Sequence, residues 1–368
     1  MALGVGIVGL PNVGKSTLFN ALTRTQNAEA ANYPFCTIEP NKATVPVPDG
    51  RLEKIAAICK PEKIIHATVD FIDIAGLVRG ASKGEGLGNK FLANIREVDA
   101  TLQVVRCFDD ENVVHVEGGV DPLRDIEIVE TELVLADIQS LEKRLERLSR
   151  QARTDKDARK EVDAMEALMK HLSEGRAARA FPRAESDAIL PTLVELQLLT
   201  DKPTIYCANV AETDVAASDK NPQVAKVRAH AAKTGADVVV VSARMEAELA
   251  GMGDADRAEF LSSYGLKEGG LDQTIRMAYH TLGLCSYFTG GPKEARAWTI
   301  HRGWTAPKAA GVIHSDFERG FIRAEICAYD DYIRLGGEAP CRTAGKLRVE
   351  GKEYLMQDGD VVHFLFNV

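Results

Sequence analysis

A glycine-rich segment near the N-terminus has the residue types and spacing of a phosphate-binding loop. Residues 9–17 read Gly-Leu-Pro-Asn-Val-Gly-Lys-Ser-Thr and fit the pattern G-x-x-x-x-G-K-S. The apolar run 5–8 before it predicts a strand, and the leucine spacing over 15–23 predicts a helix, which is the context that the pattern requires. In that context, backbone N–H groups and the positive end of the helix dipole face the phosphates. The sequence therefore predicts a nucleoside triphosphate site; the alternative is a glycine-rich turn without a ligand.

Side chains of this loop supply the groups that phosphate chemistry needs. We expect Lys15 to reach the β- and γ-phosphate oxygens and to serve catalysis, and the Ser16 hydroxyl to ligate Mg²⁺. The residues predicted to bind the phosphates are Asn12, Val13, Gly14, Lys15, Ser16 and Thr17.

Two further segments have the form of nucleotide switch elements. Asp73 follows an apolar strand pattern and begins a D-x-x-G segment. Asp73 would hold Mg²⁺ through water, and the Gly76 N–H would sense the γ-phosphate. Thr37 lies where a switch loop would lie, and its hydroxyl is suited to a magnesium contact; an ordinary loop threonine is the alternative. The predicted metal ligands are therefore Ser16, Thr37 and Asp73.

The residue after the D-x-x-G segment is Leu77, where many GTPases have a glutamine that orients the attacking water. Leucine cannot form a hydrogen bond to water, so either catalysis is slow or another group does this work. The local candidates are His115, Glu85 and a bound cation. We expect His115 to be catalytic; the alternative is a solvated loop histidine.

Base recognition is predicted for the segment 209–212, which reads Asn-Val-Ala-Glu after an apolar strand pattern. GTPases carry N-K-x-D here, and its Asp accepts hydrogen bonds from guanine N1–H and the 2-amino group. Val210 and Glu212 replace the Lys and the Asp, whereas Asn209 keeps an amide that can pair with adenine N7 and N6. We therefore favour ATP, with GTP or mixed use as the alternative. The residues expected to contact the nucleoside are Asn209, Val210, Glu212, Ser242 and Ala243.

Apolar runs separated by helical segments predict an α/β fold with a mostly parallel sheet covered on both faces. Charged helical sequence interrupts this pattern between about 123 and 199, and alternating residues with turn signals follow after about 283. We expect a nucleotide-binding domain at 1–122 and 200–282, a helical insertion at 123–199 and a C-terminal domain at 283–368. The predicted strands of the first domain are residues 5–8, 68–73, 101–105, 204–209 and 237–241.

Narrow apolar seams on two helices predict that the insertion is an antiparallel coiled-coil hairpin. The seam residues are Val134, Ile138, Leu141, Leu145 and Leu148 on the first helix, and Val162, Met165, Met169 and Leu172 on the second. Basic residues toward the tip could contact RNA phosphates, and a solvated helix face is the alternative. They are Arg144, Arg147, Arg150, Arg153, Lys156, Arg159 and Lys160.

Composition limits the class of protein. The 368 residues are 45 % hydrophobic and 27 % charged, a globular balance. There is no run of about 18 apolar residues, so no membrane span is expected, and no signal peptide is expected either. The net charge of −9 argues against a protein that coats DNA or RNA with its whole surface. Seven scattered cysteines without a C-x-x-C pair indicate neither a zinc site nor a disulfide framework, so we expect a reduced cytoplasm.

Four segments together resemble the Obg-like ATPases, the YchF family: residues 9–17, 32–41, 73–77 and 209–212. The run 32–41, Asn-Tyr-Pro-Phe-Cys-Thr-Ile-Glu-Pro-Asn, is highly specific, and the resemblance covers essentially the whole chain. It implies a GTPase-type P-loop fold that prefers ATP, a coiled-coil insertion and a C-terminal TGS domain of β-grasp type. It also implies association with the ribosome, as the 50S subunit or the 70S particle, and a role in translation or stress response.

The resemblance carries the same site residues over and adds two points. Leu77 matches the hydrophobic replacement of the glutamine in this family. Asn12 matches a P-loop asparagine that related enzymes use to hold K⁺ near the phosphates, where the ion supplies positive charge; the alternative is an asparagine that satisfies a backbone turn. Three functions stay open: an ATP-hydrolysing switch on the ribosome, a GTP-dependent translation factor, and a nucleotide-gated ribosome-binding module with negligible turnover.

Overall fold

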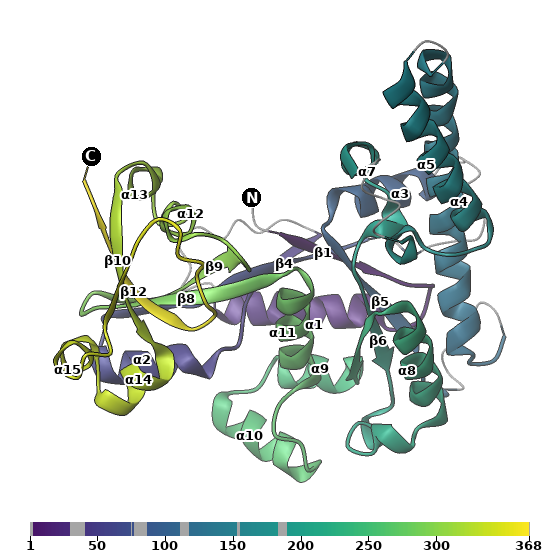
Figure 1. Cartoon of the computed structure of the whole chain (residues 1–368). Helices are drawn as coiled ribbons and strands as arrows, with labels where there is room; N and C mark the ends of the chain where they lie inside the picture. The colour runs from purple at the N-terminus through teal and green to yellow at the C-terminus, as the bar shows by residue number, and fades with distance from the viewer. Residues whose placement is uncertain are drawn as a thin grey trace.

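The chain is built around two separate β-sheets, each of which packs against helices (Figure 1). The computed structural model describes residues 3–29, 41–74, 76, 87–110, 118–152, 155–182 and 190–367. Within these residues it contains two sheets of six strands each. None of the helices described is long and apolar enough to cross a membrane.

The first sheet has the strand order β2-β4-β1-β5-β6-β7 and confirms the predicted α/β fold. Its neighbours pair in parallel except β2, which runs antiparallel to β4. The central strands β1 and β5 are buried along their whole length, as expected where helices cover both faces of a parallel sheet. The strands are β1 (Gly4–Val8), β2 (Lys42–Pro46), β4 (Thr68–Asp73), β5 (Ala100–Arg106), β6 (Thr204–Asn209) and β7 (Asp237–Val241).

Helices cover both faces of the first sheet. Strand β6 illustrates this, because its alternate side chains pack against helices on opposite faces. Ile205 and Cys207 pack in a core with α11 (Gly270–Thr281), whereas Tyr206 and Ala208 pack in another with α8 (Pro222–Thr234). Helices α1 (Lys15–Glu29) and α9 (Ala243–Leu249) contact each other, and α3 (Leu87–Glu97) contacts β1. Because the parallel strands end at one edge, the loops after β1, β4, β5, β6 and β7 gather there.

The insertion forms a hairpin of two long helices that projects from the body (Figure 1). Asp121 caps α4 (Pro122–Gln151), whose first residue is a proline, a combination typical of a helix start. Helix α5 is Lys156–Ser173. The predicted seam residues lie together in one core cluster, either buried or partly buried: Val134, Ile138, Leu141, Leu145, Leu148, Val162, Met165, Met169 and Leu172.

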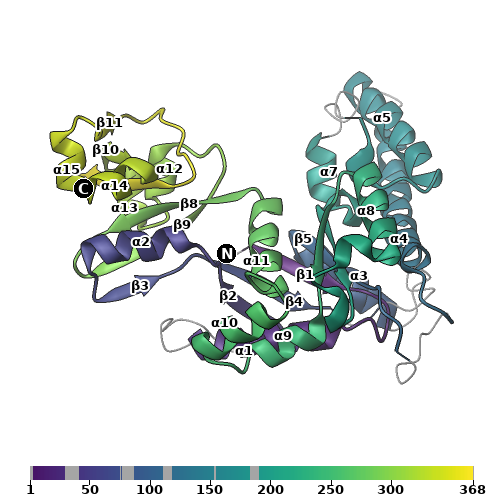
Figure 2. The ribbon, with the colours of Figure 1, turned by 90° about the horizontal axis from the view of Figure 1, so that it is seen from below.

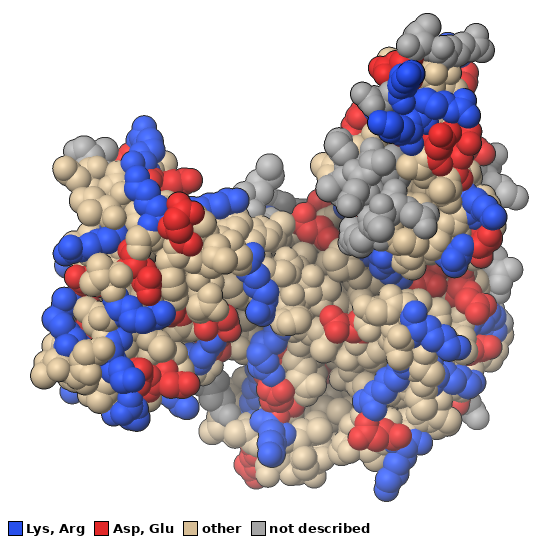
Figure 3. Space-filling view, in the orientation of Figure 1, with Lys and Arg blue, Asp and Glu red and all other residues tan. Residues whose placement is uncertain are grey.

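Basic and acidic side chains lie side by side on the outer part of this hairpin (Figure 3). Arg144 pairs with Glu161 and Glu195, and Arg150 pairs with Glu146 on the same helix. These ion pairs offset part of the positive charge that the sequence places near the tip.

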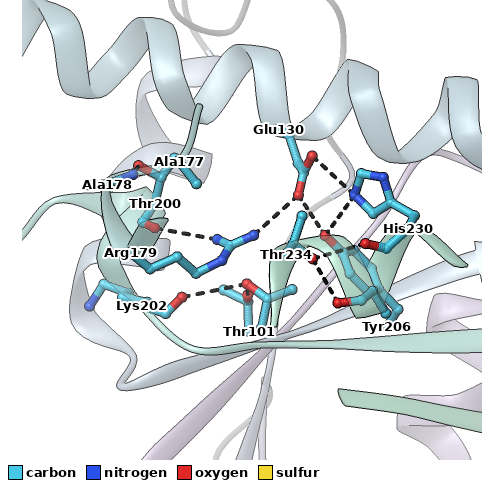
Figure 4. Close-up of polar contacts among 12 residues, drawn as sticks. Thr101, Glu130, Ala177, Ala178, Arg179, Thr200, Lys202, Tyr206, His230 and Thr234 are labelled. Atoms are coloured by element: carbon cyan, nitrogen blue, oxygen red, sulfur yellow. Dashed lines mark hydrogen bonds and ion pairs between the residues drawn. The ribbon is translucent and has the colours of Figure 1, made fainter. Parts of the chain in front are cut away.

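A partly buried polar network joins the hairpin to the first sheet (Figure 4). The Glu130 carboxylate on α4 accepts hydrogen bonds from the Tyr206 hydroxyl at 2.5 Å and from Arg179 at 3.2 Å, and His230 lies 3.4 Å away. Burial alone would raise the pKa of Glu130, but these hydrogen bonds and the Arg179 charge outweigh it and hold the pKa below its usual value. The network therefore favours an ionised Glu130.

The second sheet has the order β11-β10-β12-β8-β9-β3 and mixes parallel and antiparallel pairs. Its strands are β3 (Lys63–Ile65), β8 (Leu284–Gly290), β9 (Glu294–His301), β10 (Phe321–Ala328), β11 (Arg348–Glu350) and β12 (Asp360–Phe366). Shorter elements complete the description: α7 (Leu190–Leu196), α10 (Asp254–Ser263), α12 (Ala306–Ala310), α13 (Ser315–Arg319), α14 (Tyr329–Leu335), α15 (Glu338–Thr343), and the 3₁₀ turns Ala178–Ala180, Leu199–Asp201, Glu212–Asp214 and Ser218–Lys220.

The second sheet is not built from the C-terminal sequence alone, which corrects the expected boundaries. Strand β3 lies within the range 1–122 that we assigned to the nucleotide domain, yet it pairs with β9. Helix α2 (Gly50–Cys59) contacts β8, β9 and α14, and it lies beside the second sheet in Figure 2. Its Arg51 binds Asp358 at 2.9 Å. The chain thus leaves the first sheet after β2, forms α2 and β3 against the second sheet, and returns to the first sheet at β4. The sequence missed this because a three-residue strand has no readable periodicity and its partner is distant along the chain.

Candidate nucleotide-binding site

The loop after β1 has the backbone geometry of a phosphate cradle. Gly14 has a φ of 98° and Asn12 a φ of 63°, both in the left-handed region. A Cβ atom on Gly14 would collide with the amide of Asn209, and one on Gly9 would lie 2.7 Å from the Val104 carbonyl oxygen. Glycine at positions 9 and 14 thus lets the loop approach the neighbouring strands closely.

The two phosphate-sensing motifs lie in contact. The Lys15 ammonium, at the start of α1, lies 3.0 Å from Oδ1 of Asp73 at the end of β4. A Cβ on Gly76 would lie 3.7 Å from the Gly9 carbonyl oxygen, so the D-x-x-G segment borders the loop. Ser16 and Thr17, on the first turn of α1, are exposed. The structure thus brings Lys15, Ser16, Asp73 and Gly76 to one place.

Asn209 braces this loop. It ends β6 and is only 3 % exposed. Its Nδ2 donates to the Val13 carbonyl oxygen at 2.9 Å, and its Oδ1 accepts from the Ala243 backbone N–H at 2.9 Å. One side chain therefore ties together the loops after β1 and β7. From the sequence we predicted only that Asn209 recognises adenine, and not that it braces the loop. After these two hydrogen bonds, its side-chain amide retains one N–H that can donate to a base.

A cavity of about 530 Å³ opens beside the loop, a size suited to a nucleoside. Eight residues that the sequence predicted for nucleotide binding line it: Asn12, Gly14, Thr17, Asn209, Val210, Glu212, Ser242 and Ala243. Six further residues line it that the sequence did not predict: Phe108, Asp109, Asp110, Ala211, Thr213 and Arg244.

Phe108 is a functional candidate that the sequence reasoning missed. It follows β5 at the same edge of the sheet, and a buried arginine fixes its loop. Arg106 is 2 % exposed, donates to the Phe108 carbonyl oxygen at 3.0 Å, and has its guanidinium 4.7 Å from the centre of the Phe108 ring. An aromatic residue just after a predicted parallel strand was the available signal.

Ser242 and Ala243 shape the cavity mainly through the backbone. Ser242 caps α9, and its hydroxyl oxygen accepts from the Met245 N–H at 3.4 Å. The Ala243 N–H is already bound to Asn209. Val210 is buried, and its N–H donates to the Val241 carbonyl oxygen. These contacts hold the loops after β6 and β7 beside each other.

Comparison with known proteins agrees with this arrangement. A family model described as a 50S ribosome-binding GTPase matches residues 4–136, and a model for the C-terminal region of YchF GTPases, described as a protein of unknown function, matches residues 284–367. Proteins named ribosome-binding ATPase YchF are similar over the full length of both chains, with 53 % identity in Bacillus subtilis and 54 % in Haemophilus influenzae. The chain belongs to the YchF family. The solved structure of the Schizosaccharomyces pombe YchF GTPase is 40 % identical, with a TM-score of 0.88 over 99 % of this chain and 97 % of that one.

Membership of the YchF family confirms the resemblance drawn from the motifs, but it leaves individual roles to be tested. Thr37, Leu77, Glu85 and His115 lie outside the described residues, so their roles stay predictions.

The donor set fits Mg²⁺ in the way usual for P-loop proteins. Ser16 offers a hydroxyl and Asp73 a carboxylate, and both are the oxygen ligands that Mg²⁺ prefers. Within the described ranges, no group of three or more His, Cys, Asp or Glu side chains is placed to hold a metal. Such a metal is usually bound by one or two protein oxygens together with substrate phosphates, a requirement that Ser16 and Asp73 satisfy.

Proposed function

We propose that this chain binds and hydrolyses ATP with Mg²⁺ in the cytoplasm and acts on the ribosome. The observation that carries this proposal is the cavity at the ends of β5, β6 and β7, which adjoins the phosphate loop and has Val210 and Glu212 at the positions where a guanine site has Lys and Asp. The relatives from Bacillus subtilis and Haemophilus influenzae, alike over their full length, are named ribosome-binding ATPases. The Schizosaccharomyces pombe relative is named a GTPase, so the base preference needs a direct test.

The residues that line the cavity favour the binding of adenine over guanine. Val210 offers an apolar wall in place of the lysine of GTPases, and the Phe108 ring is available to stack on a base. Asn209 retains one N–H, which can donate to purine N7. Glu212 stands where GTPases have the Asp that reads guanine, but its carboxylate is longer by one methylene.

At the phosphates, the contact between Lys15 and Asp73 must change when nucleotide binds. The Lys15 ammonium would leave Asp73 for the β- and γ-phosphate oxygens, and Asp73 would become free to face the metal. Mg²⁺, when bound, neutralises charge on the phosphates. The backbone N–H groups from Val13 to Ser16 would orient the phosphates, and Gly76 would sense the γ-phosphate.

Hydrolysis needs a group that orients water, and Leu77 cannot supply it. We keep His115 and Thr37 as the proposed catalytic and metal-binding residues of the switch segments. For Asn12, the left-handed backbone by itself supports the turn role, since asparagine tolerates this conformation. A K⁺ site at Asn12 is a separate proposal, which hydrolysis with and without K⁺ tests.

The ribosome proposal draws on the names of the relatives and on the projecting hairpin, whose basic residues could meet RNA phosphates. The mixed charge of this surface keeps a second possibility open, in which nucleotide only gates ribosome binding without turnover. Stimulation of hydrolysis by ribosomes would exclude that possibility.

The first experiment is binding of labelled ATP and GTP to the purified protein with Mg²⁺. We expect tighter binding of ATP than of GTP, and loss of both in Lys15→Ala because the phosphate contact is removed. Preference for GTP would refute the ATPase proposal and favour a GTP-dependent translation factor. Hydrolysis assays with ribosomes and K⁺ then test turnover.

A further inference from the structure

Two charged side chains face each other at the rim of the nucleoside cavity. Glu212 begins the 3₁₀ turn after β6, and Arg244 lies in the first turn of α9, after β7. Arg244 Nε lies 3.0 Å from Glu212 Oε1, and both residues line the cavity. The pair therefore links the two loops that would enclose a base.

The Glu212 carboxylate retains accepting capacity. Its Oε1 atom is shielded from solvent, and in the described part of the chain no donor is aligned to form a hydrogen bond with it. The contact with Arg244 is thus an ion pair without hydrogen-bond alignment. The contact with Arg244 covers Oε1, but the carboxylate has a second oxygen, Oε2, and a carboxylate accepts several hydrogen bonds, so the group as a whole can still accept from a ligand.

The two purines differ in what they would offer this acceptor. Adenine carries a 6-amino donor where guanine carries the O6 acceptor. A carboxylate fixed beside that position accepts from adenine and repels guanine. A mobile glutamate, however, could turn to guanine N1–H and the 2-amino group, as the Asp of ordinary GTPases does. Selectivity therefore depends on where the carboxylate is held.

We propose that Arg244 sets the preference for adenine by holding the Glu212 carboxylate where it accepts from the 6-amino group. Arg244 is then a positioning residue, which acts through Glu212 and does not read the base itself. This inference rests on the proposed ATP function and assigns its selectivity to one ion pair.

The exposure of the pair sets its strength. The Arg244 side chain is 79 % exposed and that of Glu212 26 % exposed, and an ion pair so open to water contributes little to stability. A bound base would cover the pair and lower the local dielectric, which strengthens the same contact. The effect of Arg244 should therefore be seen in nucleotide selectivity and hardly at all in the stability of the free protein.

Three nucleotides isolate the predicted contact: ATP, GTP and purine riboside triphosphate, which lacks the 6-amino group. A hydrogen bond to a charged acceptor corresponds to about tenfold or more in affinity. We expect the full-length protein to bind ATP at least about tenfold more tightly than purine riboside triphosphate.

Four variants then locate the origin of the selectivity. Arg244→Ala should lower the preference for ATP over both other nucleotides by roughly threefold to tenfold, and Arg244→Lys should restore most of it. Glu212→Gln should lower it further, because an amide can donate to guanine O6. The double variant should match Glu212→Gln alone, since Arg244 acts only through the carboxylate. Arg228→Ala is the matched control, because it removes an exposed, ion-paired arginine on α8.

The outcomes separate this inference from the proposed function. If the unaltered protein prefers GTP, the ATPase proposal itself fails. If it prefers ATP but Arg244→Ala changes the affinity for all three nucleotides by one factor, or leaves all unchanged, the positioning role of Arg244 is overturned. Equal affinity for ATP and purine riboside triphosphate would refute the proposed hydrogen bond between the Glu212 carboxylate and the 6-amino group.

Discussion

Replacing Asn209 by alanine tests whether one buried amide holds the nucleotide site together. The change removes the donor to the Val13 carbonyl oxygen and the acceptor of the Ala243 N–H, both at 2.9 Å in a region excluded from solvent. Each backbone group left without a partner costs about 1–3 kcal/mol. We therefore expect Asn209→Ala to lower the free energy of unfolding by roughly 2–6 kcal/mol, the upper part of the range arising if water cannot enter.

Two measurements follow this change separately. Thermal unfolding reports the loss of stability, and hydrogen exchange of the Ala243 amide reports the local bond, which should exchange faster in the variant. Affinity for ATP and GTP should fall together, because a displaced loop loses its phosphate contacts whatever the base. Asn209→Asp separates the two bonds: it keeps an acceptor for Ala243 but sets a carboxylate oxygen against the Val13 carbonyl oxygen.

The control is Asn94→Ala, since Asn94 is exposed on α3 and should change stability by less than about 0.5 kcal/mol. Unchanged stability and unchanged Ala243 exchange in Asn209→Ala would refute the bracing role. A loss of ATP affinity alone, with GTP affinity intact, would instead assign Asn209 to base reading.

Three other changes test separate parts of the structure. Gly14→Ala should abolish nucleotide binding and destabilise the fold by about 1–3 kcal/mol, because the new Cβ would collide with Asn209 and the backbone at this position has a positive φ. Unfolding experiments and ATP titration measure the two effects, and normal ATP binding by the variant would contradict the prediction. Burial raises the pKa of Glu246 to about 7, although hydrogen bonds to its carboxylate act to lower it. The folded state therefore binds the proton more tightly than the unfolded chain does, and the stability of the protein falls as the pH rises from 4.5 to 7. Glu246→Gln should remove that fall of about 3 kcal/mol, as melts at pH 5 and pH 8 would show; an equally steep fall in the variant contradicts the assignment. Arg51→Ala should cost about 1–3 kcal/mol by breaking the bridge to Asp358, with faster proteolysis near residue 283 as the readout; unchanged proteolysis would show that packing alone joins these parts.

Local sequence patterns were sufficient for the phosphate loop and for the five parallel strands of the first sheet, but not for its antiparallel edge strand β2. The predicted strands correspond to β1, β4, β5, β6 and β7, because buried parallel strands are continuous apolar runs that need no knowledge of their partners. The loop was predictable for a related reason: its glycines, lysine and hydroxyl residues act within one short segment.

Contacts between distant segments were not predictable in the same way. The sequence identified Asn209 but not its bracing role, since its partners are backbone groups of Val13 and Ala243, which any residue type offers. Arg244 stood beside the predicted base motif, yet its pairing with Glu212 depends on how two loops approach each other in space. Phe108 was missed because it offers the cavity an aromatic surface and no side-chain hydrogen-bonding group.

The membership of β3 in the second sheet has a consequence for how the chain acquires its structure during synthesis. Strand β3 leaves the ribosome before its partner β9 by more than half of the chain. At roughly 5–20 residues per second, this interval is of the order of ten to fifty seconds. During that time α2, with Leu52 and Ile55 destined for the core, has no C-terminal sheet to cover it. The nascent N-terminal region must therefore expose an apolar helix or shelter it elsewhere, and truncating the chain near residue 283 would make that exposure permanent.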